Sequence, residues 1–402
     1  MSEPIKFTEK TKRRVAGRAG FRCSFPSCDK PTIGPGARSN ETAVTGKAAH
    51  IYSASPGGPR GQGTLSKDQL RSSENAIWLC SDHATYVDTN RGEKFPPNLL
   101  LSYKALQEAK IARQQSGINA SAGWFHELRL IESPIFAANA RILFGKLTVI
   151  VGGNGSGKTA LCEWMSGLGD PSRLRRWDHP RETDRRLHLQ VTYFDPREQH
   201  ARIEVAAPDS IMYYLEDKRV PFYPLKLGLV HLPQYLIRPA SEDLRDELQL
   251  VSDVLRIPTT TLRNLIPCVN QNNEGCVRNL RLVGNEGKLM LLADHEGEKK
   301  ARCFRETSDS QQGKVLIELC VAMARFSSEF LPTILMIEGG ILSFDPKNFA
   351  RYAEYFMSGG HHFQTIVMLI RSPTGGSKEW SGWEFVRLVG EKTSVTIDQS
   401  PF

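Results

Sequence analysis

The pattern of apolar and polar residues changes once along this chain of 402 residues. From Trp124 onward, continuous apolar runs and alternating segments are separated by stretches of helical periodicity, which is typical of an α/β layer fold. The first third differs, because residues 31–73 are rich in Gly, Pro and Ser and should form loops. We therefore expect the α/β fold class, with a small loop-rich domain ahead of a larger layered one.

A helix should close the first domain over residues 97–115, and a short polar segment without periodicity follows it. The apolar residues that can share one face of this helix are Leu99, Leu101, Ala105 and Ala109. The domain boundaries that we predict are 1–115 for the first domain, 116–123 for a linker and 124–402 for the second domain.

The net charge of +8 comes from the first third of the chain. Residues 1–120 hold 18 Lys and Arg against 10 Asp and Glu, whereas the rest of the chain holds 34 of each. Such an excess of cations suits a polyanion such as DNA, because neutralising phosphates releases counterions. A solvated basic face would account for the charge alone equally well.

Composition narrows the class of protein further. With 40% hydrophobic and 24% charged residues, the chain should fold rather than stay disordered. No apolar run approaches the ~18 residues of a membrane span, and the charged N-terminal residues lack the apolar stretch of a signal peptide. We expect a cytoplasmic protein with no membrane partner, in which eight cysteines do not form a disulfide framework.

Two short pairs of metal-binding residue types occur in the first domain, Cys23-x4-Cys28 and Cys80-x2-His83. Thiolate and imidazole are the ligands that tetrahedral Zn²⁺ prefers. A small loop-rich domain has a small hydrophobic core, and a structural metal would stabilise it. The alternative is two unrelated thiol clusters. The later cysteines show no such pairing with histidine, so we expect buried apolar residues at Cys162, Cys268, Cys276, Cys303 and Cys320.

Three segments in order, RAGFRCSFPSC, GKAAHIYSASPGGPRG and SENAIWLCSDHATYVD, resemble the zinc-containing branch of the HNH endonucleases over residues 11–115. The resemblance implies a ββα-metal site, in which a hairpin carries the histidine and a helix carries metal ligands. It implies that His50 is the general base, that Asn75 holds the His-bearing loop and that Asp88 is a metal ligand. A neutral imidazole suits water activation, and Mg²⁺ or Mn²⁺ would stabilise charge on the phosphate.

Four further positions qualify this resemblance. Arg60 and Arg71 are candidates for contacts with DNA phosphates. Ala49 precedes the catalytic His position, where an acidic residue is common in the family. Ala84 stands where the family commonly has a metal-binding His, so either His83 binds zinc, which we favour, or it serves the catalytic cation. A catalytically inactive DNA-binding or sensor protein therefore stays open as an alternative.

Gly152-x4-Gly157-Lys158-Thr159 is a P-loop motif between an apolar run and a helical segment. Backbone N–H groups of such a loop close around phosphates at a helix N-terminus. Lys158 would reach the β- and γ-phosphates, and Thr159 would hold Mg²⁺. The nucleotide-binding residues that we expect in the loop are Gly152, Asn154, Gly155, Ser156, Gly157, Lys158 and Thr159.

Four further segments resemble the ABC-type ATPases of the SMC-like group: GGNGSGKT, LVHLPQY, SDSQQGKV and TILMIEGGILSFDP. The resemblance implies Gln234 as the Q-loop glutamine, Ser310 as the signature serine that contacts a partner's γ-phosphate, and Glu338 at the Walker B position. Gly339 and Arg371 stand where that group has its catalytic Glu and switch His. We therefore expect ATP binding with Mg²⁺ and slow hydrolysis.

The remaining expectations concern the second domain as a whole. His361 and His362 are loop residues rather than substitutes for the missing base. About 70 residues between Gln234 and the signature are too few for coiled-coil arms, so we expect a compact helical insertion there. The arginine-rich word RLRRW (173–177) should be a solvated face.

Together the two resemblances predict a metal-dependent DNA endonuclease whose cleavage of double-stranded DNA is gated by ATP binding, as in bacterial anti-phage nuclease–ATPase systems. They imply a homodimer or higher oligomer through the ATPase domains, and a second defence-system protein as a possible partner. A DNA-repair ATPase is a further alternative, which the lack of a coiled coil and of a catalytic Glu disfavours.

Overall fold

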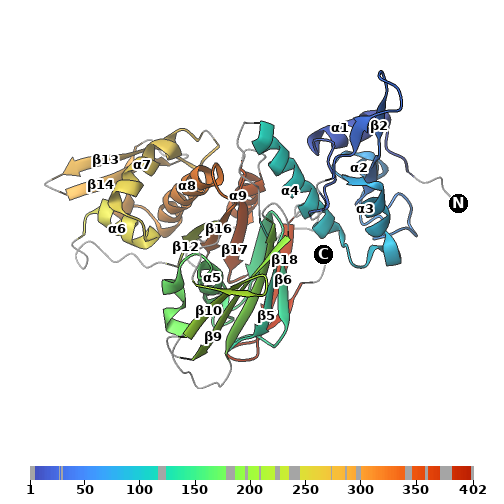
Figure 1. The fold of residues 1–402 in the computed structure, drawn as a ribbon. Coiled ribbons are helices and arrows are strands. Elements are labelled where there is room, and N and C mark those ends of the chain that lie inside the picture. The colour runs from blue at the N-terminus through green and yellow to red at the C-terminus, as the bar shows by residue number, and fades with distance from the viewer. Residues whose placement is uncertain are drawn as a thin grey trace.

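The computed structural model describes most of the chain and shows a small N-terminal module beside a larger part built of layered sheets and helices (Figure 1). The described residues are 5–26, 28, 30–115, 124–177, 186–194, 198–207, 210–221, 227–234, 245–272, 274–285, 288–295, 300–339, 346–357, 361–371 and 383–399. The predicted linker 116–123 and Asp345 of the FDP word therefore lie outside the described residues. No helix in these ranges is both long and apolar enough to cross a lipid bilayer.

The N-terminal module consists of short elements, which agrees with its Gly- and Pro-rich sequence. Its elements are α1 (Glu9–Arg18), β1 (Ile33–Pro35), β2 (Thr42–Val44), β3 (Gly46–His50), α2 (Lys67–Arg71), β4 (Ala76–Cys80), α3 (Ser81–Tyr86), the 3-10 turn η1 (Thr89–Gly92) and α4 (Pro97–Gln115). β1 pairs antiparallel with β2 and β3 pairs antiparallel with β4, and α3 follows β4 directly. β3, β4 and α3 thus form a ββα unit.

Two small cores lie on opposite faces of the β3–β4 pair, because successive side chains of a strand point to opposite faces. One face carries Ala48, Ala76 and Trp78, on which α1 packs with Phe7, Val15, Ala16 and Ala19. The other face carries Ala49, Ile77 and Leu79, and packs against Leu99, Leu100 and Tyr103 of α4 and against Cys23 and Cys80.

A parallel sheet forms the centre of the second part of the chain. Its order is β12-β16-β17-β7-β18-β19, in which the first five strands are parallel and β19 is antiparallel. The strands are β7 (Leu147–Val151), β12 (Gly228–Leu232), β16 (Thr333–Glu338), β17 (Gln364–Leu369), β18 (Trp383–Val389) and β19 (Thr396–Asp398). β7, β16 and β17 are buried at every position, so their continuous apolar runs fit strands covered on both faces.

A second, antiparallel sheet covers one face of this central sheet together with α5 (Lys158–Ser166), and their side chains share one core (Figure 1). Its order is β11-β10-β9-β8-β5-β6. The strands are β5 (Phe125–Glu132), β6 (Ala140–Leu143), β8 (Leu187–Phe194), β9 (Glu198–Ala207), β10 (Ser210–Leu215) and β11 (Lys218–Val220), and the 3-10 turn η2 (Pro171–Trp177) precedes β8.

The opposite face of the parallel sheet carries helices and an inserted lobe, and the sequence predicted only part of this lobe correctly. The elements are α6 (Glu247–Leu255), α7 (Thr259–Asn270), β13 (Val277–Asn285), β14 (Lys288–His295), β15 (Arg302–Cys303), the 3-10 turn η3 (Phe304–Glu306), α8 (Asp309–Ser328) and α9 (Pro346–Met357). The insertion was expected to be helical, and this is wrong for its second half, which is a three-stranded antiparallel sheet. Alternating strand residues such as Leu280 and Leu291 pack on α6 and α7.

Helix α4 exists as predicted, but its buried stripe differs from the predicted one. Leu99 is buried, whereas Leu101 and Ala105 are only half-buried, and the side chain of Ala109 lies outside the described part. The buried positions are Leu99, Leu100, Tyr103, Leu106, Gln107 and Ile111. This wider stripe arises because α4 has two partners: the N-terminal module, and Trp124 at the start of the second part, on which Leu106 packs.

Candidate functional site

The loop between β7 and α5 has the backbone conformation that a P-loop requires. Gly155 and Gly157 have φ angles of +79° and +88°, which residues with a side chain rarely adopt. A Cβ atom on Gly157 would also lie 2.7 Å from the Phe136 ring. Since α5 begins directly after Gly157, its free N–H groups face the loop.

The Lys158 ammonium folds back over this loop. Its Nζ atom donates to the carbonyl oxygens of Gly152 and Gly153, both at 2.6 Å. Burial lowers the pKa of Lys158 from its usual value, although Glu338 opposes this shift. A ligand phosphate would offer the ammonium a fully charged acceptor in place of two carbonyl dipoles.

Glu338 ends β16 and lies against the P-loop helix. Its Oε2 accepts a hydrogen bond from Thr159 Oγ1 at 2.5 Å, and its Oε1 lies 2.9 Å from Nε2 of His231 on β12. Burial alone would raise the pKa of Glu338, but the hydrogen bonds from His231 and Thr159 outweigh it and hold the pKa below the usual value. Glu338 is therefore a carboxylate beside the hydroxyl that the P-loop motif assigns to Mg²⁺.

These groups open into one cavity of about 330 Å³. Its lining residues include Asn154, Gly155, Gly157, Lys158, Thr159, Gln234 and Glu338. The structure thus brings together P-loop, Q-loop and Walker B candidates that lie up to 184 residues apart in the sequence, between Asn154 and Glu338. Gly152 and Ser156 belong to the loop but do not line the cavity, since the Ser156 side chain is buried beneath it.

Two lining residues come from the segment RLRRW (173–177), in which Arg175 and Arg176 are exposed, as expected of a solvated face, whereas Leu174 and Trp177 are buried. Arg176 and Trp177 both line the cavity, and the Arg176 guanidinium lies 4.8 Å from the Trp177 ring centroid. Glu163 on α5 holds both, through Arg176 Nε at 2.5 Å and Trp177 Nε1 at 2.8 Å. The sequence of the segment alone could not predict that Arg176 and Trp177 line the cavity, because the residue that holds them, Glu163, belongs to α5.

The other residues named by the ABC-type resemblance do not line this cavity in the single chain, apart from Gly339. Ser310 lies in the first turn of α8 and Arg371 is exposed after β17. Gly339 is buried and donates its N–H to the Met368 carbonyl. Because glycine has no side chain, no second carboxylate directly follows Glu338. His361 is a buried loop residue between Tyr355 and Phe363, and burial lowers its pKa to about 3.

Cys162, which was expected to be a buried apolar residue, lies close to the polar residues His231 and Glu338. Cys162, His231 and Glu338 each have a ligand-type atom within 4.8 Å of the others, although the sequence shows no pairing of Cys162 with a histidine. The Cys162 side chain is fully buried, and its thiol also contacts the Met368 sulfur at 3.5 Å. Cys276 and Cys320 are buried as predicted, whereas Cys268 and Cys303 are half-buried.

In the N-terminal module, His50 is the last residue of β3 and lies opposite Ala76 in the strand pair. Its ring stacks on Phe7, with centroids 3.8 Å apart and an interplanar angle of 15°. Nε2 is buried and has no hydrogen-bond partner among the described residues. Burial lowers the pKa of His50, a shift that Asp88 opposes and Arg60 reinforces, so the imidazole is neutral at neutral pH.

Asn75 ties the segment after His50 to the strand pair. Its amide Nδ2 donates to the carbonyls of Tyr52 and Leu70 at 3.0 and 3.1 Å, and its Oδ1 accepts from the Tyr52 N–H at 2.7 Å. The side chain is 4% exposed, so these bonds are shielded from water. The contact to the His-bearing loop is the one that the resemblance implies for Asn75.

Arg60 does not present its guanidinium to solvent, so its prediction as a phosphate contact is wrong. The side chain is 3% exposed and donates to the carbonyls of Ile51, Val87 and His50 at 2.7–2.9 Å. It also bonds Asp88 Oδ1 at 2.6 Å. Arg60 thus connects the strand end that carries His50 to the segment after α3 that carries Asp88. Arg71 ends α2 and is exposed.

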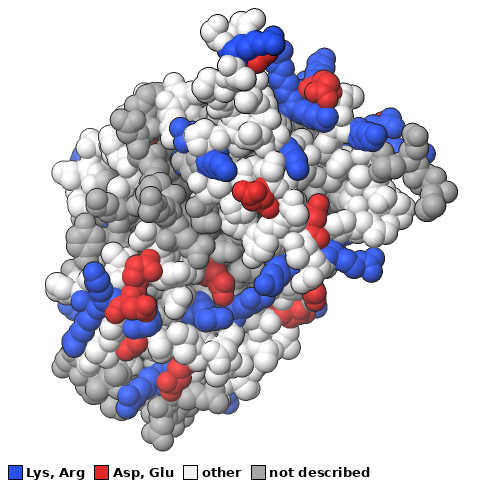
Figure 2. All heavy atoms as spheres, turned by 45° about the vertical axis from the view of Figure 1, so that its right-hand side comes forward, with Lys and Arg blue, Asp and Glu red and all other residues white. Residues whose placement is uncertain are grey.

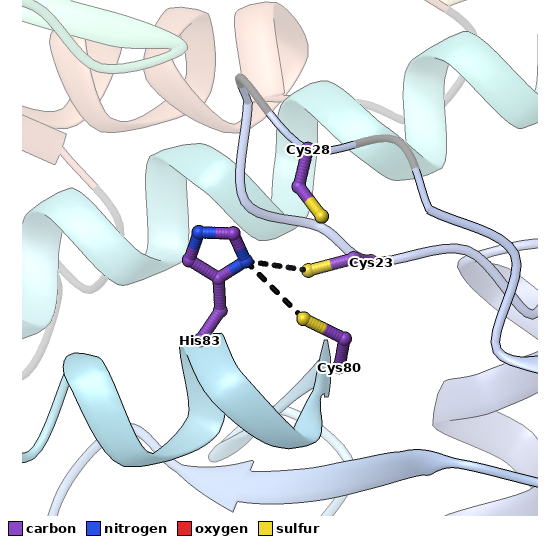
Figure 3. Close-up of side chains that lie close together, drawn as sticks. All are labelled: Cys23, Cys28, Cys80 and His83. Atoms are coloured by element: carbon purple, nitrogen blue, oxygen red, sulfur yellow. Dashed lines mark hydrogen bonds between the residues drawn. The ribbon is translucent and has the colours of Figure 1, made fainter.

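The four predicted zinc ligands form one cluster (Figure 3). His83 Nδ1 lies 3.2 Å from Cys80 Sγ and 3.6 Å from Cys23 Sγ, and all four ligand atoms lie within 4.8 Å of one another. Ligand atoms around tetrahedral zinc are about 3.3–3.8 Å apart, so a small contraction would enclose the ion. His83 thus faces the three thiols, and its ring stacks on Phe25 with centroids 4.1 Å apart.

The thiol chemistry of the cluster fits a soft or borderline cation. Burial raises the pKa of Cys23 to about 12 and also raises the pKa of Cys28. These thiols therefore stay protonated unless a cation replaces their protons, which zinc does on binding.

Solved structures similar to this chain are head domains of SMC proteins and RecF. The "SmcHead bound to the C-winged helix domain of ScpA" has a TM-score of 0.45 and 15% sequence identity, over 69% of this chain and 98% of that chain. The SMC head domain from Thermotoga maritima has a TM-score of 0.41 and 13% identity, over 69% and 99%. The recombination mediator protein RecF with ATP has a TM-score of 0.41 and 11% identity, over 69% and 99%. No protein-family model and no curated protein matches the sequence.

Proposed function

We propose that this protein binds ATP with Mg²⁺ in its second domain and that the bound nucleotide controls a metal-dependent DNA endonuclease in its N-terminal module. The observation that carries the proposal is the convergence of Lys158, Thr159 and Glu338 on one cavity, in a chain that also holds a neutral His50 next to a carboxylate. The first set is what a nucleoside triphosphate needs, and the second is what phosphodiester hydrolysis needs.

The nucleotide site has a partner for each part of ATP. The N–H groups at the start of α5 and the Lys158 ammonium would hold the phosphates. Glu338 and Thr159 would hold Mg²⁺, which neutralises charge on the phosphates when bound. Arg176 is exposed at the cavity and lies over the ring of the buried Trp177, so its planar guanidinium would face the base.

Hydrolysis of ATP should be slow, because the residue after Glu338 is Gly339 and has no side chain to activate water. Glu338 itself is engaged by His231 and Thr159. Slow turnover keeps the ATP-bound state populated, which suits a switch better than a motor.

In the nuclease step, the His50 imidazole would take a proton from the attacking water, for which its neutral state is required. Asn75 keeps the loop after His50 in place, and Arg60 keeps Asp88 beside it. Asp88 would hold Mg²⁺ or Mn²⁺, which stabilises charge on the scissile phosphate when bound. The Cys23, Cys28, Cys80 and His83 cluster would hold a structural Zn²⁺.

The assembly we propose follows from the ABC-type resemblance. Two chains would enclose ATP head to tail, with Ser310 of each chain against the other's γ-phosphate. Dimerisation would bring two His50 sites together for a cut in both strands of DNA. A role in bacterial defence against phage or foreign DNA, with a second defence-system protein, follows from the same resemblance.

The test is cleavage of supercoiled plasmid by the full chain with Mg²⁺ or Mn²⁺, with and without ATP. We expect nicked and linear products from the wild type, and at least a 100-fold lower rate for His50→Ala, since general base catalysis contributes about 10²–10⁴-fold. A matched control is His200→Ala, a half-buried histidine on β9 outside both sites. Cleavage that survives in His50→Ala would refute the nuclease assignment.

A second function, DNA binding without cleavage, is favoured by one observation. The Arg60 guanidinium occupies one oxygen of Asp88 and brings a positive charge to the place where a cation would bind. This alternative requires zinc for folding but no Mg²⁺ or Mn²⁺ for its effect. Specific binding to plasmid with no His50-dependent cut in any divalent cation would select it.

A further inference from the structure

Helix α1 carries the densest positive charge of the N-terminal module. Its ten residues include five Lys or Arg and one acidic residue, Glu9. Glu9 pairs with Lys12 at 2.7 Å, and Arg18 pairs with Glu108 of α4. The three remaining cations of the helix, Lys10, Arg13 and Arg14, are exposed and form no ion pair with any described carboxylate.

These three cations form one stripe. Residues three and four apart lie on the same face of a helix, so Lys10 lies beside both Arg13 and Arg14. Gly17 continues the stripe, and a Cβ atom built on it has no described atom within 4 Å. The opposite face is anchored by Val15 and Ala16 in the core. The stripe is therefore open on the outside and rigidly held on the inside.

The helix also lies next to the proposed general base. Alternation along β3 puts His50 on the same face as Ala48, and this is the face that α1 covers. Phe7, three residues before Lys10, stacks on the His50 ring. Ile5 fixes the start of this segment by donating its N–H to the Ala54 carbonyl at 3.1 Å. The cations thus lie about one helix diameter, roughly 10 Å, from the strand face that carries His50.

From this placement we infer that the outer face of α1, with Lys10, Arg13 and Arg14, is the surface that binds the backbone of the double-stranded DNA delivered to His50. The inference rests on the proposed nuclease function and replaces Arg60 as the source of phosphate contacts. Duplex DNA carries one negative charge per about 1.7 Å of its axis, so a stripe of this length meets several phosphates. Blue side chains outnumber red ones in the upper part of Figure 2, where the N-terminal module is turned toward the viewer.

The experiment compares two triple variants of the full chain. Lys10→Ala, Arg13→Ala and Arg14→Ala remove the stripe, and alanine maintains the helix because it has the highest helix propensity. The control variant removes three equally exposed cations of the second part of the chain, Lys218, Arg219 and Lys288. Binding of a fluorescein-labelled 30-base-pair duplex is measured by anisotropy between 50 and 300 mM KCl without Mg²⁺, and zinc content and circular dichroism check folding.

For the α1 variant, we expect at least tenfold weaker binding at 100 mM KCl. The slope of log K against log salt should become shallower by about 2 to 3, since each lost phosphate contact removes about 0.9. The control should bind within threefold of wild type. An unchanged slope in the folded α1 variant, or an equal loss in the control, would overturn the inference.

The same proteins separate this inference from the proposed function. If wild type shows His50-dependent plasmid cleavage but the α1 variant keeps its salt slope, only the α1 surface is wrong. If wild type binds no duplex at all, both proposals fail. If the stripe instead mediates binding to vesicles of phosphatidylglycerol, with no effect on DNA, α1 is a membrane-surface contact and the inference is overturned.

Discussion

The two candidate sites each hold a carboxylate with a hydrogen-bonded cationic or neutral partner, yet they are built in opposite ways. Glu338 is buried at the end of a fully buried strand, and its partners Thr159 and His231 come from adjoining core elements. Asp88 lies between α3 and η1 with a side chain that is 45% exposed, and the buried Arg60 holds it. The first site depends on the sheet, and the second depends on individual side chains and on the metal that we propose for the cysteine cluster.

The largest effect should come from removing the metal cluster. Cys80→Ser should abolish zinc binding and unfold the N-terminal module, because structural zinc contributes on the order of 10 kcal/mol to folding. ATP binding should persist, since the parallel sheet has its own core. Zinc is measured by mass spectrometry, unfolding by mapped proteolysis and nucleotide binding by a fluorescent analogue. Cys268→Ser, outside the cluster and half-buried, is the control, and a protease-resistant Cys80→Ser module would contradict the prediction.

Arg60→Gln should have the next largest effect. It removes a buried cation with bonds to three carbonyls and to Asp88, and the free energy of unfolding should fall by about 3 kcal/mol. Arg60→Lys should not restore it, because an ammonium cannot reproduce the planar fork. Hydrogen exchange of the N-terminal module measures the change, and Arg71→Gln, an exposed arginine, should shift it by less than about 0.5 kcal/mol.

Lys158→Ala tests the other side of the comparison. The loss of a charge-assisted contact of about 1.5–3 kcal/mol should weaken ATP binding 10- to 100-fold. Folding should be unaffected, because the hydrogen bonds of the ammonium within the described part of the chain go to the loop carbonyls and Ser156. Lys288→Ala is the matched control in a nucleotide-binding titration. Equal affinities for wild type and Lys158→Ala would show that the cavity does not hold the phosphates as proposed.

The smallest effect concerns Phe7. Burial holds the pKa of His50 below its ordinary value, so cleavage should be constant at neutral pH and fall as the pH drops through that lowered pKa. Phe7→Leu removes the aromatic stack and admits water, which should raise the pKa and move the acid limb to higher pH. The rate at pH 6 should fall by about threefold, given the ~0.5–1.5 kcal/mol of an aromatic contact. Phe7→Tyr should restore the profile, and an unshifted Phe7→Leu profile would contradict a role for the stack.

The comparison also explains which features the sequence predicts well. Local patterns succeeded: the P-loop, the carboxylate that ends β16, and the two pairs Cys23/Cys28 and Cys80/His83 are set by spacing over a few residues. The α/β class followed from continuous apolar runs, because a strand covered on both faces has no polar positions.

Contacts between distant segments were not predictable. His231 and Glu338 are 107 residues apart, and nothing near LVHL indicates that the imidazole reaches a carboxylate on the next strand. Arg60 was assigned to the surface because arginine usually lies there. Its burial depends on a left-handed backbone, with φ of +64°, and on acceptors up to 28 residues away. The β-strands after α7 were not predicted. The residues before them have helical periodicity, and this led us to expect helices throughout the insertion.

Helix α4 has a mechanical consequence. Its 19 residues span about 28 Å at 1.5 Å per residue. One end packs beneath the cysteine cluster through Leu99 and Tyr103, while Leu106 packs on Trp124 and Tyr103 also contacts His126 of β5. The helix is thus a rigid connection between the two parts of the chain, and it contacts the start of the second part near its own middle, at Tyr103 and Leu106. A tilt of about 10° at Leu106 would move the Pro97 end, about 14 Å away along the helix, by roughly 2 Å, enough to align or misalign two catalytic groups.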